Sequence, residues 1–123
     1  MWIPSKQTRR HVEQFLDLPA TGREQDWEIE LSDHRRIGDF LEKYTEEFLD
    51  EETKIAICAI LIASFNDSLV NRCFSKNDWL FFVELTIDKL SVIEESGLLD
   101  IWNCRNTEDN YEICKYLNIY LPI

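Results

Sequence analysis

The residues of this chain best able to do chemistry are its carboxylates, and their spacing is unusual. Glu46 and Glu47 are closely followed by Asp50, Glu51 and Glu52. Carboxylates stabilise the start of a helix and destabilise its end, because the helix dipole is positive at the start. The last three acids fit the cap and first turn of a helix, but the first two fall where a preceding helix should end. We call these five residues the first acidic patch and predict that they bind a partner.

Acid–base catalysis is the other use of paired carboxylates, and the sequence does not favour it. Glycoside cleavage, for example, needs one carboxyl group desolvated in a cleft, and nothing in the spacing indicates a cleft. A nucleophilic site needs a serine or cysteine beside a histidine. His11 and His34 both lie among charged residues, and Cys58 lies in an apolar run where thiols are inert. We therefore predict that the protein is not an enzyme.

Metal and cofactor sites have no sequence signature here. The chain contains no Cys-x-x-Cys, His-Glu-x-x-His or Glu-x-x-His motif. Its three glycines are isolated, so they do not form the glycine-rich loop that holds nucleotide phosphates. We expect neither a metal nor a cofactor.

A second group of acids falls within residues 78–95, whose apolar periodicity predicts one amphipathic helix. At about 100° per residue, one face of that helix carries Glu84, Asp88 and Glu95 and lies apart from the apolar face. We call these three residues the second acidic patch. No basic neighbour is evident for it, and we predict that it also contributes to partner binding.

The overall charge narrows the class of partner. The chain has 24 acidic and 13 basic residues, a net charge of −11. Binding to nucleic acid requires cations to meet the phosphates, so we expect no nucleic-acid partner. The basic doublets Arg9-Arg10 and Arg35-Arg36 are expected to pair with the protein's own acids. A basic protein surface is the natural complement of this charge.

The sequence also predicts a compartment. No run reaches the roughly 18 to 20 apolar residues that span a bilayer, and no apolar signal core follows the N-terminal basic residues. We expect a cytoplasmic protein without a membrane partner. In that compartment the four cysteines, Cys58, Cys73, Cys104 and Cys114, are predicted to be reduced thiols.

The predicted fold is all-α, a single compact domain over residues 1–123 with five or six helices, two of them buried at its centre. The chain has a suitable length for one domain, is 45% hydrophobic, and has only three Gly and three Pro. Apolar periodicity predicts helices over residues 5–18, 33–49, 50–73, 78–95 and 107–119, a short turn at 98–103, and coil at 19–32. Phe48 falls on the apolar face of the helix over 33–49. Residues 55–65 are apolar or small on every side, which places them in the centre.

Two segments carry a resemblance to a known group of proteins. Residues 18–31 read Leu-Pro-Ala-Thr-Gly-Arg-Glu-Gln-Asp-Trp-Glu-Ile-Glu-Leu, and residues 59–65 read Ala-Ile-Leu-Ile-Ala-Ser-Phe. With the acidic helix ending, they resemble the small bacterial immunity proteins that accompany secreted toxins, including those of contact-dependent inhibition systems. The resemblance implies a protein that binds and blocks the toxic domain of a kin-produced toxin, often a basic nuclease.

The function that we predict from the sequence is therefore non-enzymatic binding. A small acidic helical domain would neutralise a basic protein partner, and the resemblance implies that this partner is a toxin domain. The alternative is a helical structural or adaptor subunit that assembles through apolar helix faces. Salt distinguishes the two, because it weakens association between charged surfaces and spares association between apolar ones.

Overall fold

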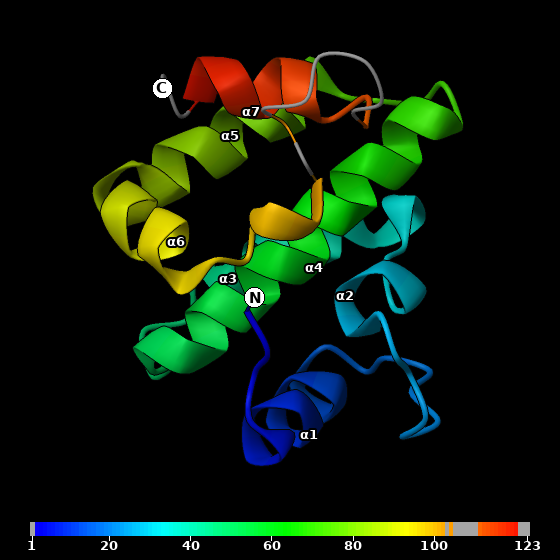
Figure 1. Ribbon diagram of the computed structural model, residues 1–123, viewed down its shortest axis with the longest axis vertical. Helices are drawn as coiled ribbons and strands as arrows, with labels where there is room; N and C mark the ends of the chain where they lie inside the picture. Colours follow the sequence, from blue (N-terminus) through cyan, green and yellow to red (C-terminus); the bar gives the residue numbers. More distant parts are fainter. Residues whose placement is uncertain (1, 103, 105–110, 121–123) are drawn as a thin grey trace.

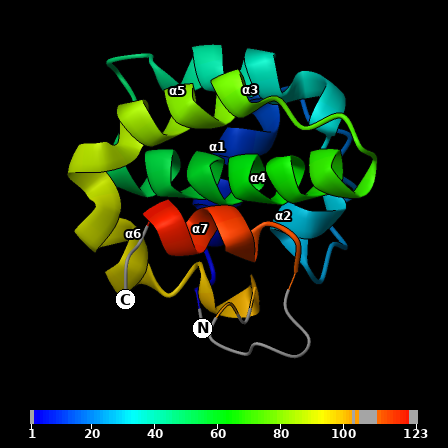
Figure 2. The same cartoon turned by 90° about the horizontal axis from the view of Figure 1, so that it is seen from above.

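The computed structural model describes residues 2–102, 104 and 111–120, and every regular element in these residues is helical, which confirms the predicted all-α class. Figure 1 shows the arrangement, and the elements in chain order are α1 (Lys6–Phe15), α2 (Trp27–Glu30), η1 (His34–Arg36), α3 (Ile37–Tyr44), α4 (Glu51–Val70), α5 (Lys76–Thr86), η2 (Ile87–Lys89), α6 (Leu90–Ser96), η3 (Asp100–Trp102) and α7 (Cys114–Tyr120). The η elements are 3-10 turns. Figure 2 shows α4 crossing the middle of the molecule, with α3 and α5 on one side and α7 on the other.

Helix α4 forms the centre as its composition predicts. Residues 55–65 are all buried, and α1, α2, η1 and α3 pack against this helix. The helix begins at the cap Asp50, whose side chain accepts a hydrogen bond from the Thr53 N–H at 2.8 Å. It ends at Val70, short of residue 73, where Arg72 adopts a positive φ of 57° and the Cys73 N–H bonds back to the chain. Among the described helices, α4 alone has the length and composition to cross a membrane, and most of it is buried inside this protein.

An aromatic cluster joins α4 to the C-terminal helices. The Phe65 ring meets the Trp79 ring edge-on at a centroid distance of 5.1 Å and the Phe82 ring at 5.6 Å. The Phe74 ring packs on the Tyr116 ring at a centroid distance of 4.4 Å, which attaches α7 to the same cluster. Of the two helices expected at the centre, α4 is buried on every side along residues 55–65. Helix α5 is buried on the side of Trp79 and Phe82 only.

The predicted helix over residues 33–49 begins where expected and is wrong at its end. Asp33 caps the 3-10 turn η1, which runs directly into α3, and α3 ends at Tyr44. At that end the hydroxyl of Thr45 donates to the Glu42 carbonyl at 2.6 Å, and the Thr45 N–H bonds to the same carbonyl. This tight last turn, followed by acids that the helix dipole disfavours, stops the helix. Residues 46–49 consequently lie in the connection to α4.

The single helix predicted over residues 78–95 is also wrong. Helix α5 begins at Lys76, after the cap Ser75, and the 3-10 turn η2 separates it from α6. The Thr86 hydroxyl donates to the Phe82 carbonyl at 2.8 Å, a bond that competes with the helical ladder and accompanies the break. Gly97 ends α6 with a φ of 80°, as its position predicts.

The remaining predictions are partly confirmed. Trp27 is buried, and it begins the short helix α2 in a region predicted to be coil. The turn η3 carries the buried Trp102. Helix α7 begins at Cys114, and the predicted start at Thr107 lies outside the described residues.

Candidate functional site

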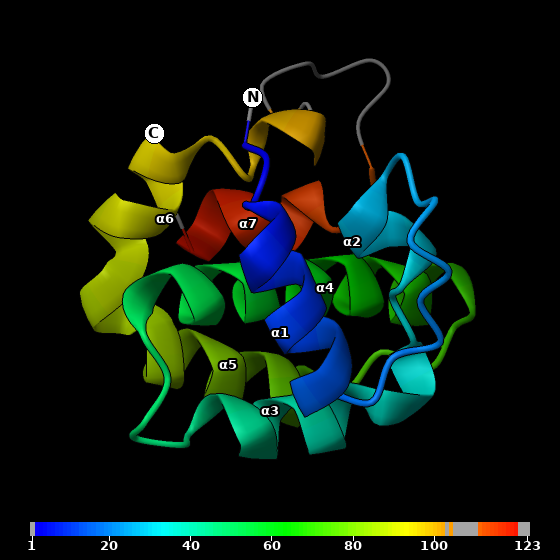
Figure 3. The same ribbon diagram turned by 90° about the horizontal axis from the view of Figure 1, so that it is seen from below.

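The first acidic patch lies where the chain passes from α3 to α4. Figure 3 shows this connection as an open stretch of chain that leads into the start of α4. Glu46 and Glu47 lie in the connection, Asp50 caps α4, and Glu51 and Glu52 form its first turn. All five side chains are exposed. The structure therefore brings the residues of this patch together at one corner of the molecule.

Two acids of the patch have a structural use. Hydrogen bonds from Thr53 lower the pKa of Asp50, because they favour the charged carboxylate that caps the helix. The hydroxyls of Thr8 and Ser5 lower the pKa of Glu52 in the same way, and these hydroxyls belong to the start of α1. Asp50 and Glu52 therefore help to fix the start of α4 and to join it to α1.

The two acids of the connection, by contrast, have no ion-pair partner among the described residues. The lysines on the adjoining helices lie over aromatic rings instead. The Nζ of Lys43 is 5.2 Å from the centroid of the Phe15 ring, and the Nζ of Lys54 is 5.6 Å from that of Tyr44. Neither lysine therefore neutralises Glu46 or Glu47 through an ion pair.

Phe48 is the functional candidate that sequence reasoning missed. It was expected on the buried face of a helix, but its side chain is 69% exposed because α3 ends before it. Its ring rests edge-on against Phe15 at 5.7 Å. Exposed aromatic residues inside a polar rim are typical of the energetic centre of a protein interface. The signal in the sequence was an aromatic residue directly inside a run of acids.

The second acidic patch does not lie on one continuous helix. Its three exposed residues are distributed over α5, η2 and α6: Glu84, Asp88 and Glu95. The break at η2 therefore removes the single stripe that a continuous helix would present. Exposed apolar side chains, Leu80, Phe81 and Ile87, accompany these acids on α5 and η2.

One ion pair joins the first acidic patch to η2, the turn that carries Asp88 of the second patch. The Nζ of Lys89, in η2, lies 3.6 Å from Oε1 of Glu51, in α4. Figures 1 and 3 both show the start of α4 beside the segment from η2 to α6. The first patch therefore lies next to η2 and its Asp88. Of the eight acidic residues in the two patches, only Glu51 forms an ion pair within the described chain.

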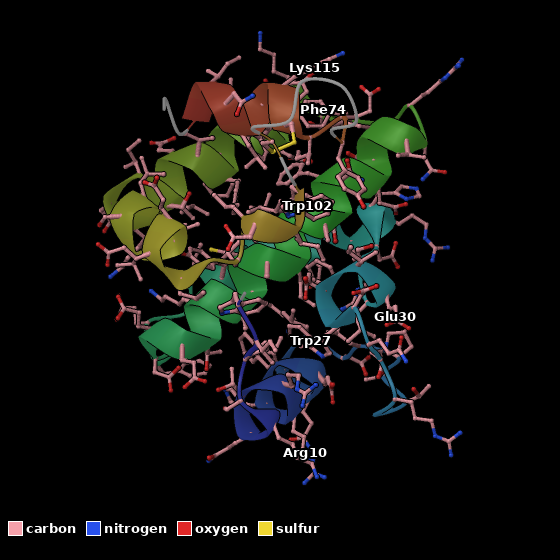
Figure 4. The ribbon with its side chains drawn as sticks, viewed as in Figure 1. Arg10, Trp27, Glu30, Phe74, Trp102 and Lys115 are labelled. Carbon is pink, nitrogen blue, oxygen red and sulfur yellow. A yellow bond between two sulfur atoms is a disulfide. The ribbon has the colours of Figure 1, made fainter. Side chains whose placement is uncertain are left out.

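The basic doublets differ from each other. Arg35 pairs with Asp33 at 3.1 Å and Arg36 with Asp39 at 2.7 Å, as predicted. Arg9 and Arg10 form no ion pair among the described residues, and Arg10 points into solvent (Figure 4).

A histidine–aspartate pair is the arrangement most similar to a catalytic one. His34 Nδ1 lies 2.6 Å from Oδ2 of Asp67, beside a cavity of about 330 Å³. The same carboxylate oxygen also accepts the backbone N–H of His34 at 3.1 Å. Ser32, which lines the cavity, donates its hydroxyl to the Ile29 carbonyl. These bonds fasten η1 to α4, so the geometry has a structural explanation.

The cysteines correct one prediction. Cys104 and Cys114 form a disulfide, with their Cα atoms 5.0 Å apart, so the expectation of four reduced thiols is wrong for this pair. Cys58 and Cys73 are free. Burial raises the pKa of the Cys58 thiol to about 12, so it stays protonated at neutral pH and is a poor nucleophile.

The comparisons with known proteins found no match to this chain. No protein-family model, curated protein or solved structure matches it. Within the described residues, no three His, Cys, Asp or Glu side chains are grouped so that they could hold a metal ion. The site must therefore be interpreted from its own geometry.

Proposed function

We propose that this chain is a non-enzymatic acidic protein that binds and neutralises a basic protein partner. The partner is a bacterial toxin domain, as the resemblance to immunity proteins implies, and the binding takes place in the cytoplasm without nucleic acid or membrane. One observation carries the proposal: Glu46 and Glu47 are exposed and unpaired beside the exposed ring of Phe48.

In this proposal the charged and the apolar side chains affect different steps: charge speeds association, and buried apolar area slows dissociation. Unpaired carboxylates attract a cationic surface over a distance of about 10 Å at ordinary salt, which speeds association. Phe48 then has apolar area to bury against the partner, and this slows dissociation. The neighbouring second acidic patch extends the negative surface toward α6.

A charge-reversal experiment tests the proposal. The partner for the assay is sought in the gene next to that of this protein, and association is followed by stopped-flow or surface-plasmon methods at low and high salt. Glu46→Lys combined with Glu47→Lys should slow association by about tenfold or more at low salt, and the difference should shrink at high salt. Phe48→Ala should instead speed dissociation.

The comparison pair is Glu84→Lys combined with Glu95→Lys, which changes the net charge by the same amount in the second acidic patch and so measures how much that patch contributes. A slower rate for the first pair alone places the interface at the connection between α3 and α4. Equal slowing by both pairs would place both acidic patches in the interface, whereas association unchanged by the first pair would remove Glu46 and Glu47 from it. Failure of the protein to protect cells that express the toxin domain would refute the proposed function itself.

The second candidate function is that of a helical adaptor or structural subunit. The observation that favours it is the exposed apolar group on α5 and η2, formed by Leu80, Phe81 and Ile87. Assembly through these side chains would give a mass above the 14.7 kDa of the monomer in size-exclusion chromatography. That mass would persist or rise with salt, whereas Leu80→Lys would return it to the monomer value.

A further inference from the structure

A cavity of about 280 Å³ opens where three segments distant in the sequence meet. They are the N-terminal residues 2–4, the residues 25–28 around the start of α2, and the residues 97–101 that run from the end of α6 into η3. Figure 3 shows the N-terminal segment running beside η3. The cavity is separate from both acidic patches, since none of their residues lines it.

Two tryptophans form the aromatic part of its wall. The centroids of the Trp2 and Trp27 rings are 6.5 Å apart, and the ring planes are inclined by 53°. Trp27 is fixed, because its Nε1–H donates to Oε2 of Glu13 at 3.0 Å and its ring lies between α1 and α2 (Figure 4). Trp2 is only half-buried. A corner of this kind offers an aromatic face to a small group in the cavity.

The polar part of the wall is acidic. Asp26, Glu28 and Asp100 line the cavity together with a single base, Arg9, so three carboxylates face one guanidinium. None of the three acids has an ion-pair partner among the described residues. Burial raises the pKa of Glu28, because its charged form is partly desolvated and no cation compensates it there. A positive group would be attracted to this cavity and an anion repelled.

We infer that this cavity binds an organic cation, a guanidinium or alkylammonium group, against the ring of Trp2 and the carboxylates of Glu28 and Asp100. Aromatic faces attract such cations through the ring quadrupole, and carboxylates add direct pairing. A volume of about 280 Å³ suits one long side chain or one small amine. The cation can come from an arginine or lysine on a protein or from a free small molecule. The inference does not depend on the acidic patches.

The test uses the indole N–H signals of the full chain in ¹H–¹⁵N NMR spectra. The probes are agmatine, a capped Gly-Arg-Gly peptide, and butylurea as a neutral analogue of the guanidinium. The signals of Trp2 and Trp27 should shift in a saturable way, with a dissociation constant on the order of millimolar, while those of Trp79 and Trp102 stay in place. Shifts with the peptide alone would indicate a cation carried on a chain, and shifts with agmatine as well would indicate a site open to free amines.

Two variants separate the aromatic and acidic contributions. Trp2→Ala should weaken agmatine binding by about 5- to 30-fold, since it removes the cation–π contact, and Trp2→Phe should retain most of it. Glu28→Gln, read from the Trp27 signal, should weaken binding without disturbing the fold, whereas Glu46→Gln should leave it unchanged. Equal shifts with butylurea, or no shift at ten times the expected dissociation constant, would overturn the inference and leave the proposed function untouched.

Discussion

Reduction of the disulfide between Cys104 and Cys114 should lower the free energy of unfolding by an amount that depends on the length of the loop that the bond closes. The two residues are ten positions apart, so the bond closes a short loop. The chain-entropy relation for a loop of about ten residues gives about −9 cal/mol/K, or ~2.7 kcal/mol at 25 °C, by which the bond destabilises the unfolded state. Since the bond links the segment after η3 to the first residue of α7, its loss releases α7 from one of its attachments.

The same figure predicts a shift in the melting temperature. Unfolding entropy is about 2.1 cal/mol/K per residue near 60 °C, which for the 123 residues gives about 260 cal/mol/K. Dividing ~2.7 kcal/mol by this entropy predicts that reduction lowers the melting temperature by roughly 10 °C. Differential scanning calorimetry with and without a phosphine reductant measures the shift directly.

The controls come from the other two cysteines. Cys104→Ser should melt at the lower temperature with or without reductant, whereas Cys73→Ser, which changes an exposed free thiol, should respond to reductant as the parent protein does. Thiol titration of the unfolded, unreduced protein should find two thiols, and four after reduction. Four thiols before reduction, or a melting temperature that reductant leaves unchanged, would refute this reasoning.

Two further predictions concern the core and the central cap. Phe65→Ala should destabilise the protein by about 3–5 kcal/mol, because Phe65 is fully buried at the centre of the aromatic cluster, while Phe81→Ala on the exposed side of α5 should cost far less in the same denaturant titration. Asp50→Ala should cost about 1 kcal/mol at pH 7 and Asp50→Asn much less, since asparagine still caps α4. The bonds from Thr53 lower the folded-state pKa of Asp50, so this stabilisation is present above the unfolded pKa of about 3.9. It is lost as the pH falls through the lower folded value, and the Asp50→Ala penalty should shrink there.

The compartment bears on how the disulfide contributes. Disulfides are rare in reducing compartments, where thiols are kept reduced. A cytoplasmic protein, as proposed here, would therefore fold without this bond. A loss of ~2.7 kcal/mol is tolerable for a domain of typical stability, about 5–15 kcal/mol, because the buried residues of α4 and the aromatic cluster remain in place.

The central helix could be predicted because two independent features of the sequence indicate it. Residues 55–65 are apolar or small at every position, and Asp50 marks the start of their helix, so composition and capping agree. The helix over 33–49 was harder, because its apolar spacing continues through Phe48 and Leu49 after the helix has ended. Leu49 is buried without being helical, so periodicity alone could not locate the end. The hydroxyl of Thr45, which closes the last turn, was a local signal that competed with it.

The sequence predicted which charged residues of the candidate site lie at the surface, but it did not predict how the aromatic residues around them are arranged. All eight acids were expected at the surface, and all eight are exposed. The exposure of Phe48 follows from where α3 ends, and the aromatic corner of Trp2 and Trp27 follows from contacts between segments far apart in the chain. The disulfide depends likewise on a Cα separation of 5.0 Å, which spacing in the sequence does not determine.

The early end of α3 changes the reason for assigning Glu46 and Glu47 to a partner. In the last turn of a helix these acids would oppose the dipole, and their cost would suggest a use outside folding. Because the two acids lie outside the helix, they do not pay this penalty, and an unfavourable position in a helix is no longer a reason to assign them to partner binding. What supports it now is that the lysines on α3 and α4 face aromatic rings, while an exposed phenylalanine follows the two acids. The connection between α3 and α4 thus carries two carboxylates without an ion pair and one exposed aromatic ring. A cationic protein surface with an apolar recess would pair with the carboxylates and bury the ring.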